Sequence, residues 1–486
     1  MRKIKIIKAA FLGKIFGKGG VSYIMNISLS TEKNREIFDG ILCKERNFDI
    51  LKREIIFAGR PALLYMIDGF VKEDLLEKIL ESFYKLKPED TATEDMFRRA
   101  HIPYSSLSTE KAVDTIITQI LSGKTVLMIE GFENAFVMEL RSYPQRDTAE
   151  PDRDKVMRGS RDGFTETLTL NAALVRRRIR DRNLSVEYHS LGKISKTDVA
   201  LCYLSDRADE KILEKVRKRI DNAQIDAMTM CQEDMANIID GKMRWNPFPK
   251  YKFSERPDVA AAQIMEGDII VLIDNTPTAM ILPATIFDIA EDANDYYFPP
   301  LTGAYLRITR LLTMFVTLFV TPLWLLALHY PEQVPKAFRF VLIEEAPNVP
   351  VVLQLLMLEF IIDGLKLSSL NTPNMLSSAF SIIAGIIVSD FAVQSGWFCA
   401  QTLLYMAFVA MANYSQPGYE LGYAIKFMRM LLLVLVALFG IWGFAAGTAF
   451  TIWLILSTKI EGKKGYFWPI VPFSFKGLGR LLFRLK

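Results

Sequence analysis

Cysteine and histidine are scarce in this 486-residue sequence, and their spacing argues against metal and redox sites. None of the 4 cysteines forms a C-x-x-C pair, and the 3 histidines are equally scattered. Zinc ligands come at short spacings, and a disulfide framework needs more cysteines than these. We therefore expect no metal, no cofactor and a reducing compartment. These residues are Cys43, Cys202, Cys231, Cys399, His101, His189 and His329.

A large charge excess and catalytic motifs are also missing. Lys and Arg total 59 against 55 Asp and Glu, a net charge of +4, so we expect no nucleic-acid partner. Residues 122–125 read Ser-Gly-Lys-Thr, like the end of a phosphate-binding loop, but Thr118 stands where that loop needs its first glycine. No nucleophile elbow, zincin motif or dinucleotide fingerprint is present. We expect a protein that is not an enzyme.

Apolar residues are abundant and unevenly distributed. They make up 50% of the chain, and the mean hydropathy is +0.18. Before about Leu306 the sequence has the pattern of a soluble protein, and after it come four long apolar stretches. These stretches are 309–328, 379–393, 398–412 and 430–456. The first and last reach the roughly 20 residues that a membrane-spanning helix needs, so we interpret the chain as an integral membrane protein.

The predicted fold class is multi-domain, with two α/β (α+β) soluble lobes followed by an all-α membrane domain. Helical periodicity alternates with paired strands in both lobes. The boundaries are a basic amphipathic segment at 1–30, a first lobe at 31–141, an Arg/Asp/Pro-rich linker at 142–163, a second lobe at 164–300, the helical domain at 301–458 and a basic tail at 459–486.

Basic residues around the apolar stretches predict the topology. Arg307 and Arg310 precede the first span and Lys459 follows the last, which places both ends inside and requires an even number of crossings. Four spans satisfy this if 351–367 forms a half-helix or re-entrant segment. Residues 426 and 429, a Lys and an Arg, would then face outside, against the positive-inside tendency.

The segment 351–367 carries the candidate ion path. Glu359 and Asp363 are four residues apart and share a helical face, Lys366 follows three residues later, and Asp390 ends the next apolar stretch. Charges inside a bilayer normally face a pore, a cavity or a partner charge. A ring of such carboxylates from several subunits would favour cations. The alternative is an Asp363–Lys366 pair at the membrane interface.

An arginine-rich block covers the end of the linker and the helix that follows it, and it supplies candidate contacts between the lobes or between subunits. Its charged residues are Arg158, Arg161, Glu166, Arg176, Arg177 and Arg178. Thr165 and Glu166 suit the N-terminus of a helix, through a hydroxyl cap and a favourable dipole interaction. So many arginines beside acids suggest an ion-pair network. The alternative is a solvated, charged linker.

This block resembles the signature of the GerA family of spore germination A subunits. The resemblance rests on Arg158-Gly159-Ser160-Arg161-Asp162-Gly163-Phe164-Thr165-Glu166, Asn171, Arg176-Arg177-Arg178-Ile179, Arg256-Pro257-Asp258 and Asp274-Asn275-Thr276-Pro277. In the apolar half, Glu345-Ala346-Pro347-Asn348-Val349-Pro350 and Gln416-Pro417-Gly418-Tyr419-Glu420 look like the stage V sporulation protein AF branch. The Leu-Arg-Glu-Ala-like and Arg-Leu-Pro segments usual in receptor A subunits are missing, which argues against direct nutrient sensing.

The resemblance implies a multi-pass protein of the spore inner membrane, with its soluble lobes on the cytoplasmic core side. It implies a homo-oligomeric channel, a pentamer, that contributes to ion release during germination. It also implies other germination proteins as partners, among them a second small membrane protein. Two alternatives stay open: a secondary transporter for a small solute, and a non-conducting scaffold or receptor subunit that organises other germination proteins.

Overall fold

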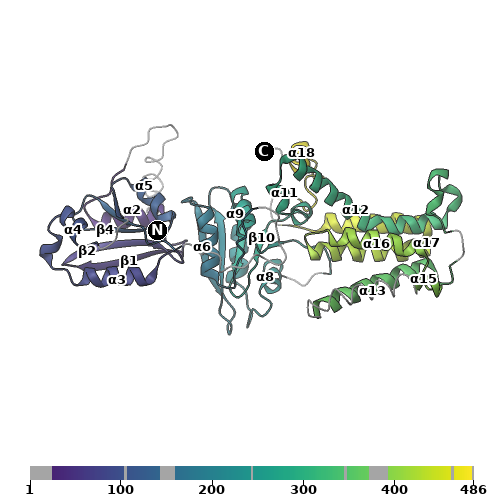
Figure 1. Cartoon of the computed structure of the whole chain (residues 1–486), viewed down its shortest axis with the longest axis horizontal. Helices are drawn as coiled ribbons and strands as arrows, with labels where there is room; N and C mark the ends of the chain where they lie inside the picture. The colour runs from purple at the N-terminus through teal and green to yellow at the C-terminus, as the bar shows by residue number, and fades with distance from the viewer. Residues whose placement is uncertain are drawn as a thin grey trace. The chain divides into compact units, whose positions relative to one another are not determined.

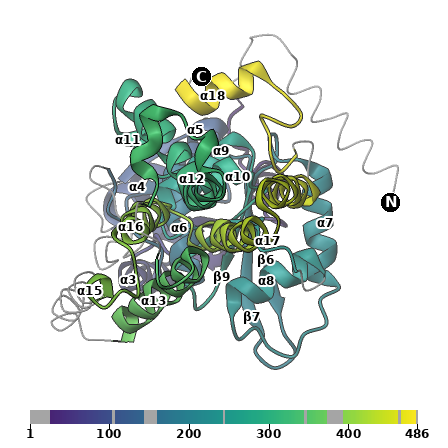
Figure 2. The ribbon, with the colours of Figure 1, turned by 90° about the vertical axis from the view of Figure 1, so that its right-hand side faces the viewer.

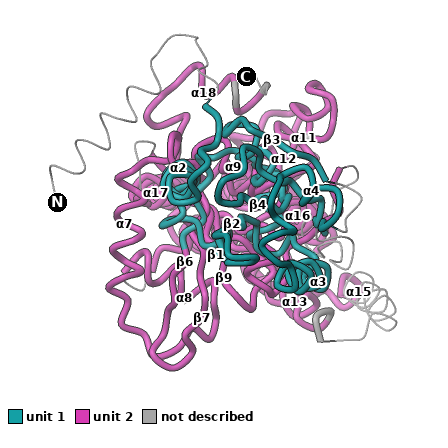
Figure 3. The backbone as a smooth tube through the Cα atoms, turned by 90° about the vertical axis from the view of Figure 1, so that its left-hand side faces the viewer, with its two compact units in different colours: residues 1–145, 172–187 teal, residues 146–171, 188–486 magenta. Residues whose placement is uncertain are grey.

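The computed structural model describes residues 25–102, 107–142, 159–241, 245–343, 347–371, 392–460 and 465–483. Arg158, Asp390 and most of the predicted basic segment and linker lie outside these ranges. The chain divides into two compact units, which Figure 3 colours separately: residues 1–145 with 172–187, and residues 146–171 with 188–486.

The first unit contains a five-stranded antiparallel sheet in the order β1-β2-β4-β5-β3 (Figure 1). Its elements are α2 (Thr31–Ile41), β1 (Ile50–Phe57), β2 (Arg60–Ile67), α3 (Glu73–Tyr84), η1 (Pro88–Thr91), α4 (Glu94–Ala100), β3 (Leu107–Glu110), α5 (Val113–Leu121), β4 (Thr125–Ile129) and β5 (Ala135–Met138). Side chains of α2 and α5 pack on one face of the sheet, and those of α3 and α4 pack on the other. Burial of both faces explains why β4 and β5 are buried throughout and apolar except at Thr125.

A second five-stranded sheet has the order β6-β7-β9-β10-β8. The elements of this region are α6 (Leu168–Arg178), β6 (Leu184–Leu191), β7 (Thr197–Leu204), α7 (Glu210–Asp221), α8 (Cys231–Asp240), β8 (Lys252–Ser254), α9 (Pro257–Glu266), β9 (Ile269–Ile273), β10 (Ala279–Leu282), α10 (Ile286–Ile289) and α11 (Asn294–Tyr297). Helices α7 and α8 cover one face of β7, β9 and β10. The two sheets with their helices confirm the predicted α+β character of the lobes.

Helices make up most of the described remainder of the second unit. They are α12 (Pro300–His329), η2 (Pro331–Gln333), η3 (Lys336–Val341), α13 (Val351–Asn371), α15 (Ala392–Gln394), α16 (Ala400–Tyr414), α17 (Tyr419–Ser457) and α18 (Phe475–Phe483). Figure 2 shows α12, α13, α16 and α17 nearly end on. Among the helices described, α12 and α17 are long and apolar enough to cross a membrane.

The segment predicted as a half-helix is a continuous helix, α13, of 21 residues. At 1.5 Å per residue it extends about 31 Å, which is close to the thickness of a bilayer core. The half-helix or re-entrant placement was inferred from the even number of crossings, and it stays a prediction, because the length of a helix alone does not set its depth in a membrane.

Helix α17, predicted as a single last span, folds back on itself at Gly440. The backbone of Gly440 is non-helical, with φ 56 and ψ −130. A Cβ built on Gly443 would lie 1.9 Å from the carbonyl oxygen of Leu435, although eight residues of straight helix span about 12 Å. The two arms, 419–439 and 441–457, therefore lie side by side and run in opposite directions.

Gly440 is the residue on which this reversal depends, because only glycine adopts its backbone conformation without strain. We expect Gly440→Val to lower stability by about 1–3 kcal/mol. The added Cβ would also lie 2.6 Å from the hydroxyl of Tyr330. The measurement is the unfolding temperature of the purified protein in detergent.

Gly364→Ala is the matched control, since a Cβ at this α13 position meets no atom within 4 Å. Its unfolding temperature should be unchanged or slightly higher, because alanine favours a helix over glycine. A Gly440→Val protein as stable as the parent would show that α17 does not reverse at this residue.

Candidate functional site

Two helices contribute the charged residues of the candidate site, an ionic cluster of Glu359, Asp363, Lys426 and Arg429. Glu359 and Asp363 lie one turn apart on α13, and Lys426 and Arg429 lie one turn apart on the first arm of α17. The spacing within each helix places its two charges on one face. Acids from one helix therefore meet bases from the other.

Glu359 lies at the centre of the ionic cluster. Its Oε1 is 2.5 Å from Nη2 of Arg429 and accepts a second bond, 2.8 Å long, from Nε. Its Oε2 is 3.2 Å from the Nζ of Lys426. The exposed fractions of these three side chains are 3%, 2% and 4%, so the charges are removed from solvent.

Asp363 closes the cluster at its exposed edge. Its Oδ2 is 2.5 Å from the Nζ of Lys426, and its side chain is 36% exposed. The sequence left open whether Asp363 pairs with Lys366, and the structure gives it Lys426 as a partner. Asp363 is the member of the cluster that solvent or an ion can reach.

Helix α12 joins the same cluster through its backbone. Nη1 of Arg429 donates a 2.8 Å hydrogen bond to the carbonyl oxygen of Thr317. A helical carbonyl already accepts a bond within its own helix, and its second lone pair receives this one. Three apolar helices, α12, α13 and α17, are thus linked by one guanidinium.

The cluster is balanced, with two acids and two bases. Isolated charges in an apolar environment cost several kcal/mol each, and hydrogen-bonded pairing offsets much of that cost. Lys426 and Arg429, which the predicted four-span topology placed on the outer side, are buried among the helices. Both lie within α17, which begins at Tyr419.

Lys366, the third predicted residue of the ion path, lies over three tyrosine rings. Its Nζ is 5.9, 4.9 and 4.4 Å from the ring centroids of Tyr414, Tyr419 and Tyr423. Such cation–π contacts stabilise an ammonium group at the end of a helix bundle. The fourth predicted residue, Asp390, lies outside the described residues.

The predicted arginine-rich contacts fall into separate environments. Arg161 and Glu166 are exposed, and Arg158 lies outside the described ranges. Arg177 and Arg178 are half-buried, and Nη1 of Arg178 donates to the carbonyl oxygen of Leu174 in its own helix. The structure therefore does not bring the predicted arginine-rich contacts together in one network among the described residues.

Arg176 is fully buried and belongs to the first unit. Its Nε is 2.7 Å from Oδ2 of Asp49, and its Nη2 is 3.0 Å from Oδ1, so the pair is bidentate. Nη1 also donates to the carbonyl oxygen of Leu184. The amide oxygen of Asn47 accepts from the backbone N–H of Val186. These bonds hold residues 172–187 within the first unit.

The N-terminus of α6 is capped by a residue from a distant part of the sequence. The helix begins at Leu168, whose N–H donates to Oδ1 of Asp274 at 2.9 Å. Thr165 is held instead by Asn171, which accepts from its N–H and donates to its carbonyl oxygen. The carbonyl oxygen of Glu166 accepts from the N–H of Asn275. The prediction that Thr165 caps α6 was wrong, although the signature residues do interlock.

A second ionic group lies where the second lobe meets α12. Arg310 Nη1 is 2.5 Å from Oδ2 of the buried Asp295, and Arg307 pairs with both Glu291 and Asp295. Burial raises the pKa of Asp295, and the two arginines oppose that rise. The sequence indicated these arginines as topology signals, but it did not predict that they would pair with acids less than twenty residues away.

Removing one partner of the Glu359–Arg429 pair should lower the free energy of unfolding more than removing both partners. Glu359→Gln leaves Arg429 uncompensated, and Arg429→Met leaves Glu359 with Lys426 alone, so we expect each to cost about 3–5 kcal/mol. The double variant retains the Lys426–Asp363 pair and stays neutral, and we expect it to recover most of the loss. The measurement is a double-mutant cycle on unfolding free energy in detergent. Additive losses would contradict a direct Glu359–Arg429 interaction.

Comparison with known proteins agrees with the resemblance seen in the sequence. A family model described as Bacillus/Clostridium GerA spore germination protein matches residues 39–486. Stage V sporulation protein AF of Bacillus subtilis (strain 168) is 32% identical over 455 residues, which cover 93% of this chain and 92% of that protein. Spore germination protein KA of the same organism is 27% identical, covering 90% and 81% of the two chains.

One solved structure is also similar, the N-terminal domain of the A subunit of the Bacillus megaterium spore germinant receptor GerK3. It is 23% identical, with a TM-score of 0.43, and covers 54% of this chain and 98% of that domain. The family model spans nearly the whole sequence, and the relative at 32% identity covers both the lobes and the helices. The chain therefore belongs to the GerA family of spore germination proteins.

Proposed function

We propose that this protein is a subunit of an oligomeric ion channel in the spore inner membrane that contributes to cation release during germination. The observation that carries the proposal is the ionic cluster inside apolar helices. Buried ionisable residues in such helices are costly, and where they occur they tend to mark ion paths. Its edge residue, Asp363, offers a carboxylate that remains accessible.

The charge balance of the cluster suggests how conduction is restrained. Lys426 lies between Glu359 and Asp363 and neutralises the carboxylate that a cation would approach. A path at Asp363 attracts cations only when Lys426 turns away from it. The cluster as seen is thus a non-conducting arrangement, and conduction requires a shift of α17 against α13.

The reversal of α17 supports a proposal for the sidedness of the lobes. Asn246, in the second lobe, donates hydrogen bonds to Thr458 and to the carbonyl oxygen of Leu454, while Ile289 packs on Gly418. Both ends of α17 therefore lie beside the second lobe. Arg307, Arg310 and Lys459 gather at the same end of the helices, which favours the cytoplasmic core side for the lobes.

A non-conducting scaffold is the second candidate. The observation in its favour is that Glu359 already has two basic partners, as expected of a residue that only holds helices together. A scaffold would tolerate the loss of the Asp363 charge. The accessible carboxylate, rather than the buried one, therefore distinguishes the two functions.

Asp363→Asn tests the ion path, because it removes the accessible charge and leaves the shape and the Glu359 pairs intact. We expect cation flux into proteoliposomes, measured with and without a co-expressed small membrane partner, to fall by about tenfold. Glu332→Gln, at an exposed acid beyond the end of α12, is the control and should conduct normally. Undiminished flux in Asp363→Asn would place the ion path away from Asp363, and no flux through the parent protein would favour the scaffold.

Oligomerisation is the second test, since the described helices are too few for a monomeric pore. We expect particles of pentameric mass in detergent. Arg161→Glu should weaken that assembly by reversing an exposed charge, while membrane insertion, which depends on the apolar helices, stays intact. Arg99→Glu serves as the control, because Arg99 is exposed and its ion pair is with Asp95 of its own helix. A strictly monomeric parent protein would contradict the channel.

A further inference from the structure

Large apolar side chains are exposed in two segments that adjoin the helices of the second unit. Trp245, in the loop before β8, is fully exposed. Phe473 and Phe475, just before and at the start of α18, are 70% and 82% exposed, and Ile470 and Val471 of the same segment are also exposed. Single exposed apolar residues are common, but several together mark a contact with a protein or a membrane.

Trp245 lies beside the C-terminal end of α17. The side-chain amide of the next residue, Asn246, donates to the carbonyl oxygen of Leu454 and to the hydroxyl of Thr458. Helix α17 ends at Ser457, so Trp245 stands where an apolar helix meets the polar part of the chain. Tryptophan is enriched at this level of membrane proteins, because its ring is apolar and its N–H is polar.

The segment 470–475 is fixed at the same end of the helices from both sides. Before it, the carbonyl oxygen of Tyr466 accepts a hydrogen bond from the N–H of Ile286, and the tyrosine hydroxyl donates to the backbone of the second lobe. After it, the carbonyl oxygen of Leu481 in α18 accepts from Nη1 of Arg307, near the start of α12 (Figure 1). The exposed residues between these two anchors are therefore held near the start of α12 and the end of α17.

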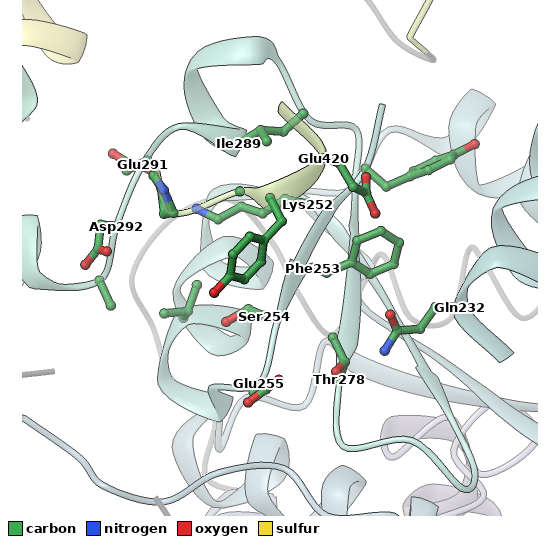
Figure 4. A pocket seen from close by; sticks show the side chains of 16 residues that line it. Gln232, Lys252, Phe253, Ser254, Glu255, Thr278, Ile289, Glu291, Asp292 and Glu420 are labelled. Carbon is green, nitrogen blue, oxygen red and sulfur yellow. The ribbon is translucent and has the colours of Figure 1, made fainter. Parts of the chain in front are cut away.

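Charges around the two exposed segments are mainly basic. The stretch 459–486 contains seven bases and one acid, Glu461, and its Lys459 and Lys476 are exposed. Several acids near the start of α17 line a cavity of about 160 Å³ instead (Figure 4). These acids are Glu255, Glu291, Asp292 and Glu420. The exposed apolar residues are not part of the walls of that cavity, so they belong to an apolar and basic surface.

We propose that Trp245 and the segment 470–476 dock the second unit on the anionic headgroup surface of a membrane, an inference that rests on the proposed membrane function. The aromatic and aliphatic side chains enter the interface, and Lys476 lies among the lipid phosphates. A second copy of this surface is a poor occupant, because an isologous contact would bring lysines together. Docking fixes the second lobe against the bilayer, so its position depends on the charge of the lipid headgroups.

The test measures tryptophan emission of the full chain in vesicles whose lipids carry bromine near the top of the acyl chains, where it quenches tryptophan at the interface. The difference between the parent and Trp245→Phe isolates the emission of Trp245, and we expect most of it to be lost in these vesicles. Phe473→Trp in the Trp245→Phe background should behave alike. Quenching at residue 473 should be stronger in brominated phosphatidylglycerol than in brominated phosphatidylcholine, and Lys476→Gln should reduce that excess.

Ile194→Trp in the same background is the matched control. Ile194 is 80% exposed in the turn between β6 and β7, where its N–H donates to the carbonyl oxygen of Asp226 in the loop after α7. Iodide in the aqueous phase should quench the emission of this variant, and brominated lipid should not.

Three results would overturn the proposal: no quenching of Trp245 and residue 473 by brominated lipid, equal quenching at residue 194, or equal quenching by the two lipids. Shielding of Trp245 and residue 473 from both lipid and iodide would assign the surface to another protein chain and also overturn it. Quenching does not require conduction, so a parent protein that docks without cation flux would contradict the channel and leave the docking surface in place.

Discussion

The helical part of this protein depends on one constraint: a charge that is buried among apolar helices must be paired with an opposite charge. Arg429 satisfies that constraint for α17 by bonding to Glu359 and to the backbone of α12. The interaction is directional as well as electrostatic, because a guanidinium offers fixed donors. The relative register of three helices is therefore set at one residue, whereas the surrounding leucines would tolerate several registers.

The same principle operates in the soluble part, with different consequences. In the first unit, Arg176 and Asp49 are both buried and bidentate, so a segment distant in sequence is held in the unit. Arg256 is also fully buried, where it pairs with Asp258 and lies over the ring of Tyr297. Gly159 of the signature block faces that ring, and any Cβ there would clash with it. These residues of the family signature therefore pack against one another inside the second unit.

Coupling between the second lobe and the helices has a physical basis in two shared regions. The hydrophobic cluster around Ile286, Phe287 and Ile289 includes Leu421 and Ile425 of α17, so lobe and helix share one core. Arg307 and Arg310 of α12 bond to acids at the end of the lobe. A displacement of the lobe would therefore also displace α12 and α17, and both of these helices contribute to the ionic cluster.

Hydropathy and periodicity in the sequence determined the two α+β lobes, the apolar half and the family, because these depend on local composition and on linear motifs. The helical face shared by Glu359 and Asp363 was predictable for the same reason. Their partners were not, since Lys426 lies 63 residues after Asp363 and only packing brings the two helices together. The reversal at Gly440 was equally hidden, because no charged residue interrupts that apolar run. Only the tertiary structure decided how these charges are neutralised, because the bases that pair with Glu359 and Asp363 come from another helix.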